Sequence, residues 1–445
     1  MIEKKKLYHV TVLSNFARAF DKYTHYYAKA GIPESTYPDR FYLLERSELD
    51  IGYQKASQLL EKLAIPGNRL ILLETQVDPA LIQENTATGR GVFIHADHIR
   101  LSALYDLEPK DGGMAWRRTV IEDMTAASLR LLSGQFQAFA ALRPRTLSIL
   151  PIAQGCQAKC AFCFSKASIS SDQAAFRPDW DTVGAWLDKA AVHGAERAVI
   201  TGGGEPTLLP FVHLEKLIAC CAERFSKVVL ISNGHAFATL AQAERIARLR
   251  ALHDAGLRVL SLSRHHFDAQ RNERIMKLNT PIEALTSTWR EHRHLWPDLR
   301  LRFICVLQDD GVEDDATLAQ YLTWAADLGV EEICFKELYV STSTESMYFD
   351  RAANDWSRHH QVPLALVTDF AARAAFSIAH RLPWGAPVFA GEWAGRPMRI
   401  AAYTEPSLYW ERTHGIARSW NVMADGRCFA SLEDRASELT LEDRT

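Results

Sequence analysis

The segment Cys156-Gln-Ala-Lys-Cys160-Ala-Phe-Cys163 places three thiols within eight residues, directly after the short apolar run 146–152. Thiolates at spacings of four and three residues can converge on one small inorganic cluster, and cysteine thiolates are the usual ligands of iron–sulfur centres. A structural zinc site or an ordinary four-iron cluster takes four protein ligands. The three cysteines therefore predict a metal centre with one coordination position left open for an external ligand.

Composition narrows the class of protein. The chain has 445 residues, of which 47% are hydrophobic and 24% charged, which are ordinary values for a soluble protein with a large core. The net charge of −3 gives no basic footprint for nucleic acid. No apolar run reaches the ~18 residues of a membrane helix, and the N-terminus lacks the pattern of a signal peptide. We expect a cytoplasmic protein, in which clustered cysteines indicate metal binding rather than disulfides.

Strand and helix patterns alternate on both sides of the cysteine segment. The expected strands are 146–152, 197–201, 227–232, 258–263, 299–307 and 331–340. The expected helices are 181–193, 211–225, 240–255, 281–295 and 315–328. This alternation is typical of βαβ units around a parallel sheet. Six units are too few for a full eight-stranded barrel, so residues 146–340 are predicted to form an α/β fold, either a partial (β/α)6 barrel or a doubly wound sheet.

The two flanking regions have different patterns. Residues 1–145 are predicted to be an α+β domain, with strand-like runs at Leu70–Leu73 and Val92–His95 and a helix at Ala56–Leu63. Residues 341–445 are predicted to form a C-terminal capping segment. Its expected elements are a helix near 364–375, strands at 398–403 and 420–423, and a hairpin that turns at Asp425–Gly426 and continues through Cys428.

Three more motifs stand at the ends of consecutive predicted strands. Thr201-Gly-Gly-Gly-Glu205-Pro206 ends the second strand, and a glycine run there lets a ligand approach the backbone closely. Ser232-Asn233-Gly234 ends the third strand. The fourth strand closes with Ser261-Leu-Ser263-Arg264-His265-His266. Each motif alone also fits an ordinary turn, but folds of this kind bind ligands at the carboxyl ends of their strands.

Together these four strand ends resemble the radical S-adenosylmethionine (SAM) superfamily, over about residues 146–340. The resemblance implies a TIM-like partial barrel in which Cys156, Cys160 and Cys163 ligate one [4Fe–4S] cluster whose open iron chelates SAM. It also implies reductive cleavage of SAM to a 5′-deoxyadenosyl radical, with an electron donor such as flavodoxin or ferredoxin. The SAM contacts that it implies are Phe162, Gly203, Gly204, Glu205, Ser232, Asn233 and either Ser261 or Ser263.

Several other residues are candidates for contact with a substrate. Arg264, His265 and His266 are expected at the rim of the barrel, where they would bind an acidic group or shuttle a proton, or serve only as polar loop residues. Lys336 and Glu337 end the sixth strand and are expected either to face the barrel mouth or to form a buried pair. Cys305 on the fifth strand is either a hydrogen-atom donor or a small buried hydrophobe.

The substrate stays open between two classes. The stretch Trp420–Ser431 resembles the hairpin of SPASM or twitch extensions, but Cys428 is its only cysteine, so no auxiliary cluster is expected. This likeness favours a peptide or protein substrate, recognised by residues 1–145. A small biosynthetic metabolite is the alternative substrate. An alternative of another class is a non-catalytic zinc or iron–sulfur interaction protein, with Cys428 as a distant fourth ligand.

Overall fold

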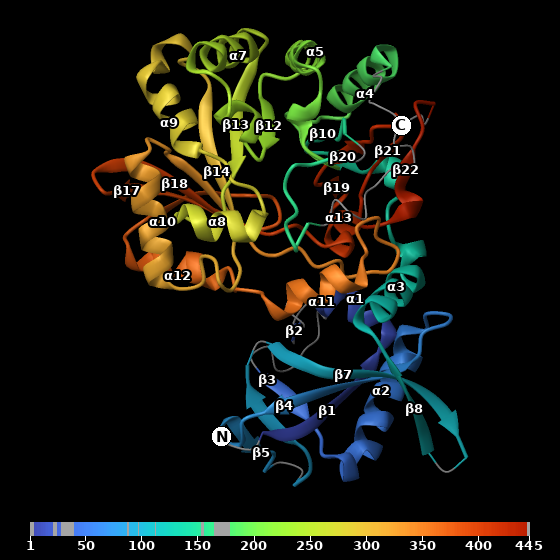
Figure 1. Ribbon diagram of the computed structural model, residues 1–445. Coiled ribbons are helices and arrows are strands. Elements are labelled where there is room, and N and C mark those ends of the chain that lie inside the picture. Colours follow the sequence, from blue (N-terminus) through green and yellow to red (C-terminus); the bar gives the residue numbers. More distant parts are fainter. Residues whose placement is uncertain are drawn as a thin grey trace. The chain divides into compact units, whose positions relative to one another are not determined.

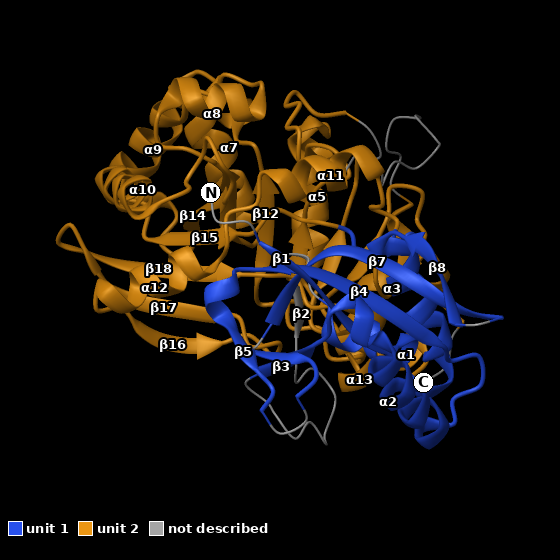
Figure 2. Cartoon of the chain, turned by 90° about the horizontal axis from the view of Figure 1, so that it is seen from below, with its two compact units in different colours: residues 1–136, 341–346 blue, residues 137–340, 347–445 orange. Residues whose placement is uncertain are grey.

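The computed structural model describes residues 4–20, 25–27, 40–86, 89–96, 98–111, 113–152, 155–163 and 179–442 (Figure 1). The chain divides into two compact units, residues 1–136 with 341–346 and residues 137–340 with 347–445 (Figure 2). By this division most of the C-terminal region belongs to the same unit as the parallel sheet. No helix among the described residues is long and apolar enough to cross a bilayer.

The first unit is an α+β structure with two antiparallel sheets. One sheet has the order β1 (Lys5–Val12), β4 (Leu70–Val77), β7 (His98–Lys110) and β2 (His25–Tyr27), with β8 (Gly113–Thr119) also paired to β7. The other has the order β3 (Arg40–Leu43), β6 (Val92–His95) and β5 (Ile82–Glu84). The helices are α1 (Leu13–Ala19), α2 (Leu49–Leu63) and α3 (Ile121–Leu131). The two strands and the helix predicted here are all confirmed.

Strand β4 is apolar along most of its length because both of its faces are covered. Ile71 and Leu73 pack in a cluster with residues of α1 and α3. Leu70 and Leu72 pack in a second cluster with residues of α2. A strand that is buried on both faces has a continuous run of hydrophobic residues rather than an alternation of hydrophobic and polar ones. This explains the apolar run at the start of β4.

The second unit is built on one open sheet of twelve strands, in the order β16-β17-β18-β15-β14-β13-β12-β11-β10-β20-β21-β22. Every pairing from β18 through to β20 is parallel. The parallel strands are β10 (Leu147–Ile149), β11 (Ala198–Ile200), β12 (Val228–Ser232), β13 (Leu257–Ser263), β14 (Arg300–Val306), β15 (Glu332–Lys336), β18 (Arg396–Tyr403) and β20 (Trp420–Val422). All six strands predicted for the barrel are present, and β18 and β20 extend the parallel run by one strand on each side.

Helices cover the outer face of this sheet (Figure 1). They are α4 (Trp180–Val192), α5 (Phe211–Ala222), α6 (His235–Ala238), α7 (Gln242–Asp254), α9 (Ile282–Glu291) and α10 (Asp315–Asp327), while α8 (Ala269–Met276) follows β13 at the carboxyl ends of the strands. Local signals set their ends. The Asp179 side chain accepts hydrogen bonds at the start of α4, and Asp314 forms a capping box with Thr317 at the start of α10. Gly329, with φ +78°, follows the end of α10.

The sheet ends in antiparallel hairpins, so its described strands form a partial barrel and not a closed one. On one side, β16 (Ser377–Arg381) and β17 (Pro387–Trp393) lead into β18. On the other, β20 turns back into β21 (Cys428–Phe429) and then β22 (Glu438–Leu439). The predicted hairpin at Asp425–Gly426 is therefore confirmed. Three further helices are α11 (Arg351–His359), α12 (Ala365–Arg373) and α13 (Leu408–His414), and a small separate sheet pairs β9 (Arg143–Pro144) with β19 (Ile416–Ala417).

Candidate active site

The cysteine segment follows β10 and is fastened to the end of helix α8. The backbone N–H of Lys159 donates to the carbonyl oxygen of Met276 at 2.9 Å, and the Cys160 thiol lies 3.9 Å from the same oxygen. Cys160 is buried, Cys163 is half-buried and Cys156 is exposed. A turn closes the segment, because the N–H of Cys163 donates to the Cys160 carbonyl at 3.2 Å. All three thiols therefore belong to one short loop at the carboxyl end of β10.

The glycine run after β11 packs directly on this loop. The Glu205 N–H donates to the carbonyl oxygen of Gly155 at 2.9 Å. A Cβ on Gly204 would collide with that same oxygen and would lie 2.7 Å from Cγ2 of Ile152. Only glycine fits such a close approach without movement of the backbone. The two motifs are separated by some forty residues in sequence, but the fold joins them into one surface.

Asn233, after β12, links the glycine turn to the first cysteine. Its backbone N–H donates to the Glu205 carboxylate at 2.8 Å, and its side-chain amide lies 3.7 Å from Sγ of Cys156. Glu205 also accepts from the N–H and hydroxyl of Thr207, at 3.1 and 2.7 Å. Although Cys156 keeps exposed surface, partial desolvation by the surrounding loops raises the pKa of its thiol and Glu205 adds to the rise, while the hydrogen bond from Asn233 opposes it. A positive ion beside Cys156 would favour its thiolate.

Three serines, one on β12 and two on β13, complete this end of the barrel. Ser232 is buried, and its hydroxyl accepts the N–H of Gly234 at 2.9 Å, which stabilises the turn after β12. Ser261 and Ser263 share the inner face of β13, because side chains two residues apart in a strand point to the same side. Ser261 is fully buried and accepts from Nε of Arg302 at 2.8 Å, whereas Ser263 is half-buried.

The comparison with family models agrees with this arrangement. Residues 150–319 match the model of the radical SAM superfamily. The chain contains a radical SAM domain. The match begins at the end of β10 and includes the cysteine loop, the glycine run, Asn233 and both serines of β13. It ends within α10, so it includes four of the parallel strands, β11 to β14.

Solved radical SAM structures are similar to this chain at low identity. SuiB from Streptococcus suis bound to S-adenosylmethionine is 15% identical, with 69% of this chain and 64% of SuiB covered and a TM-score of 0.41. anSMEcpe with bound AdoMet is 13% identical, covering 67% of this chain and 78% of that one, with a TM-score of 0.40. Coproporphyrinogen III oxidase (HemN) from Escherichia coli is 16% identical, covering 54% and 55%, with a TM-score of 0.33.

The chain spans 64% of the length of SuiB. No curated protein matches the sequence. The radical SAM domain identifies an enzyme and implies two cofactors, a [4Fe–4S] cluster and SAM.

The donor set of the cysteine loop fits that cluster. Three thiols in one loop, an amide at Cys156 and a glycine turn that excludes side-chain atoms form a surface suited to a small inorganic group. Among the described residues no three His, Cys, Asp or Glu side chains are gathered as closely as a bound metal would hold them. Cys428 is fully buried in the main core.

Arg264, His265 and His266 are buried, and none of them lines the cavity described below. The Arg264 guanidinium lies 5.6 Å from the centre of the Trp324 ring. His265 accepts the N–H of Val306 at 3.0 Å and packs edge-on against the ring of Phe162 at 5.0 Å. Burial, assisted by Arg264, lowers the pKa of His265 to about 3. In this setting His265 is a neutral ring that supports Phe162, and the proposed acid-binding role of the three residues stays a prediction.

The two cysteines near the sixth strand lie on opposite faces of the sheet. Cys305 is fully buried in the main core, with its thiol 3.6 Å from the His265 carbonyl oxygen. Cys334, on β15, lines the inner cavity. A hydrogen-donor role for Cys305 stays a prediction, but Cys334 is the cysteine on the concave side of the sheet.

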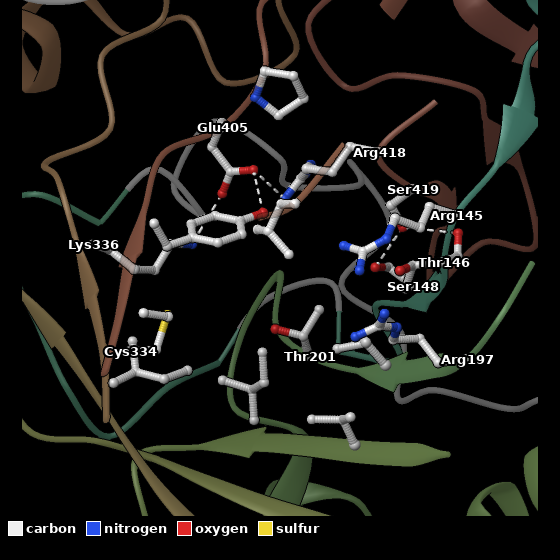
Figure 3. A pocket seen from close by; sticks show the side chains of 18 of the residues that line it. Arg145, Thr146, Ser148, Arg197, Thr201, Cys334, Lys336, Glu405, Arg418 and Ser419 are labelled. Atoms are coloured by element: carbon white, nitrogen blue, oxygen red, sulfur yellow. Dashed lines mark hydrogen bonds and ion pairs between the residues drawn. The ribbon is translucent and has the colours of Figure 1, made fainter. Parts of the chain in front are cut away.

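The inner face of the sheet encloses a cavity of about 400 Å³ (Figure 3). Near its upper end, at the carboxyl ends of the strands, Lys336 lies 2.9 Å from Glu405. Arg418 lies 2.6 Å from the other oxygen of the same carboxylate, which also accepts from the Tyr403 hydroxyl at 3.0 Å. Glu337 is buried and accepts from the hydroxyl of Thr404. Lys336 therefore faces the barrel mouth, and its partner is Glu405.

Several residues that line the cavity lie outside the four sequence motifs. Tyr403, Glu405 and Arg418 come from β18 and the loop before β20, which the expected six-strand barrel does not include. The position of Cys334 could be predicted from the sequence, because it precedes Lys336 by two residues and its side chain therefore points to the same face of the sheet. Arg145 and Arg197 lie just before β10 and β11, where an arginine usually indicates a solvent-exposed strand end.

Proposed function

We propose that this enzyme cleaves SAM reductively and uses the resulting radical to remove a hydrogen atom from a substrate in the inner cavity. In this proposal Cys156, Cys160 and Cys163 hold the cluster. The cluster, when bound and reduced by flavodoxin or ferredoxin in the cytoplasm, supplies one electron that breaks a C–S bond of SAM to give methionine and a 5′-deoxyadenosyl radical. The observation that carries the proposal is the joining of the cysteine loop, Glu205 and Asn233 at one strand-end surface.

The residues around the loop have distinct proposed tasks. Gly203 and Gly204 leave their backbone groups open to the amino group of SAM, and Glu205 fixes the turn through its three hydrogen bonds. Phe162, held by His265, is proposed to lie against the adenine. Ser232 and Asn233 shape the next turn, and Ser263 is the serine of β13 with exposed surface for a ligand. The protein's task is to orient the cofactor and exclude water.

A peptide or protein is the proposed substrate, with residues 1–145 as its recognition domain. SuiB, a solved structure that is 15% identical to this chain with a TM-score of 0.39, is bound to a precursor peptide. A small acidic metabolite is a second candidate, favoured by one observation. The cavity lining has eight Lys and Arg side chains against four Glu, a difference of four positive charges, whereas the whole chain has a net charge of −3.

Anaerobic reconstitution tests the chemistry. The protein is loaded with iron and sulfide, SAM and a strong reductant are added, and 5′-deoxyadenosine is quantified, with Cys160→Ala as the control. We expect iron near four per chain, a change in the cluster EPR signal on addition of SAM, and deoxyadenosine that disappears in Cys160→Ala. The proposal would be contradicted by a protein that carries a full complement of iron but whose cluster EPR signal does not change on addition of SAM.

A further inference from the structure

The lower end of the cavity, at the amino ends of the parallel strands, gathers cations from four strands. Arg145 precedes β10, Arg197 precedes β11, Lys227 precedes β12 and Arg302 lies on β14, and all four line the cavity. We call these four residues the basic floor. Figure 3 shows Arg145 and Arg197 on the same side of the cavity, next to Ser148 and Ser419. The shared position gives one surface with several positive donors and neutral hydroxyl groups beside them.

The charges of the basic floor are poorly compensated. Within the described part of the chain the Lys227 ammonium has no hydrogen-bond or ion-pair partner, and the buried Nε of Arg197 has none either. Arg145 and Arg197 share a single carboxylate, Glu196, at 3.6 and 3.2 Å, and that side chain is 54% exposed. Burial is the main cause that lowers the pKa of Lys227, and Arg197 and Arg302 lower it further. The free protein therefore concentrates positive charge that it does not neutralise.

The upper end of the cavity differs in this respect. There Lys336 and Arg418 bracket Glu405, so each cation has a carboxylate partner. At the amino ends, Arg300 and Glu332 are the first residues of β14 and β15 and pair with each other at 2.9 Å, so this carboxylate is already engaged. An anion entering the cavity would therefore find its unpaired donors at the floor and not at the upper end.

We infer that the basic floor binds an anionic group of the substrate, a carboxylate or a phosphate, while the reacting carbon points toward the glycine run. Guanidinium and ammonium groups are the usual donors to such anions. Thr201 follows Arg197 by four residue steps along the strand, so the floor lies roughly 13 Å below the rim at about 3.3 Å per residue. The inference deepens the proposed function and rests on it, because it takes the cavity as the substrate site. It selects a substrate whose reacting C–H bond is several bonds away from its anionic group.

Binding of simple anions tests the inference without the substrate and without SAM. Pyrophosphate and citrate are titrated calorimetrically, at low ionic strength, into the full-length protein and into Lys227→Met and Arg197→Gln. We expect saturable binding of at least one probe, weakened about tenfold in each variant, which is the loss expected for one charge-assisted hydrogen bond. A preference for pyrophosphate would indicate a phosphate group on the substrate, and a preference for citrate a carboxylate.

Two controls make the result decisive. Arg250→Gln removes an exposed arginine outside the cavity and should leave binding unchanged. Lys227→Arg should retain binding, which separates loss of charge from a folding defect. No saturable binding by the wild-type protein, or wild-type affinity in both floor variants, would overturn the inference. Anion binding by a protein that forms no deoxyadenosine would instead contradict the proposed function, so the two failures are distinct.

Discussion

The two ends of the barrel's inner face are built on different physical principles. At the carboxyl ends of β10, β11 and β12, three loops interlock through backbone hydrogen bonds and glycine contacts, and the side chains of these loops include thiols, an amide and one satisfied carboxylate. At the amino ends, single arginine and lysine side chains from separate strands face one cavity with few partners. The first end is determined by close packing and the second by charge.

This difference predicts which changes each end tolerates. A single added carbon disturbs the upper end, because backbone atoms fill the space that it would need. The basic floor lines a cavity, so it should tolerate side chains of different volume, but its binding of an anion depends on its total charge. Substitutions that damage one end should therefore leave the other intact, since a strand several residues long separates them.

The largest effect is expected from Gly204→Ala. The new Cβ would collide with the Gly155 carbonyl, so the cysteine loop must move. Overpacking of this kind costs about 1–3 kcal/mol, and we expect lower iron incorporation and loss of the SAM-dependent EPR change. The matched control is Gly184→Ala in α4, where a Cβ meets nothing within 4 Å and should stabilise the helix by about 1 kcal/mol. Equal iron loading in the two variants would show that the upper end is not sterically determined.

A smaller effect is expected from pH on anion binding. The pKa of Lys227 is lowered to about 8, by burial first and then by Arg197, Arg302 and Arg300, with Glu332 opposing them. Below pH 8 Lys227 is charged in both the folded and the unfolded protein, and keeping this charge in the folded protein lowers the free energy of unfolding. That loss of stability is relieved as the pH rises from about 8 toward 10.5, the ordinary pKa of lysine. Citrate binding should weaken over this pH range, by about tenfold between pH 7 and pH 9.5, because deprotonation of Lys227 removes one cation from the basic floor.

Lys227→Met is the control for that pH dependence. It removes the titrating group, so its citrate affinity should be low and nearly constant over the same pH range. The measurement is a calorimetric titration at several pH values with both proteins. An identical pH dependence in wild type and variant would show that another group is responsible and that Lys227 does not face the anion.

The upper end could be predicted from sequence because its chemistry is local. The three cysteines lie within eight residues, and each other motif follows a strand directly. The floor could not, because Arg145, Arg197 and Lys227 are single residues before three different strands. Only the parallel register brings them to one surface. The strands β18 and β20 were predicted as strands, but nothing local indicates that they join the parallel run at its two edges.

Cys305 shows how the register decides a role. Arg302 and Cys305 lie on the same strand but three residues apart, so their side chains point to opposite faces. Arg302 lines the cavity, and Cys305 is in the core between sheet and helices. Counting residues along the strand from Lys336 would have selected Cys334 on β15 as the thiol that shares the cavity.

The smallest effect is therefore expected from Cys305→Ala. Loss of one buried sulfur should lower the free energy of unfolding by about 1 kcal/mol and should leave iron content and deoxyadenosine formation unchanged. Cys334→Ala is the matched variant on the concave face, and the two are compared by thermal unfolding and by deoxyadenosine yield at equal iron loading. A changed yield in Cys305→Ala alone would mean that its thiol reaches the reacting species, and it would restore the hydrogen-donor role that the core position of Cys305 argues against.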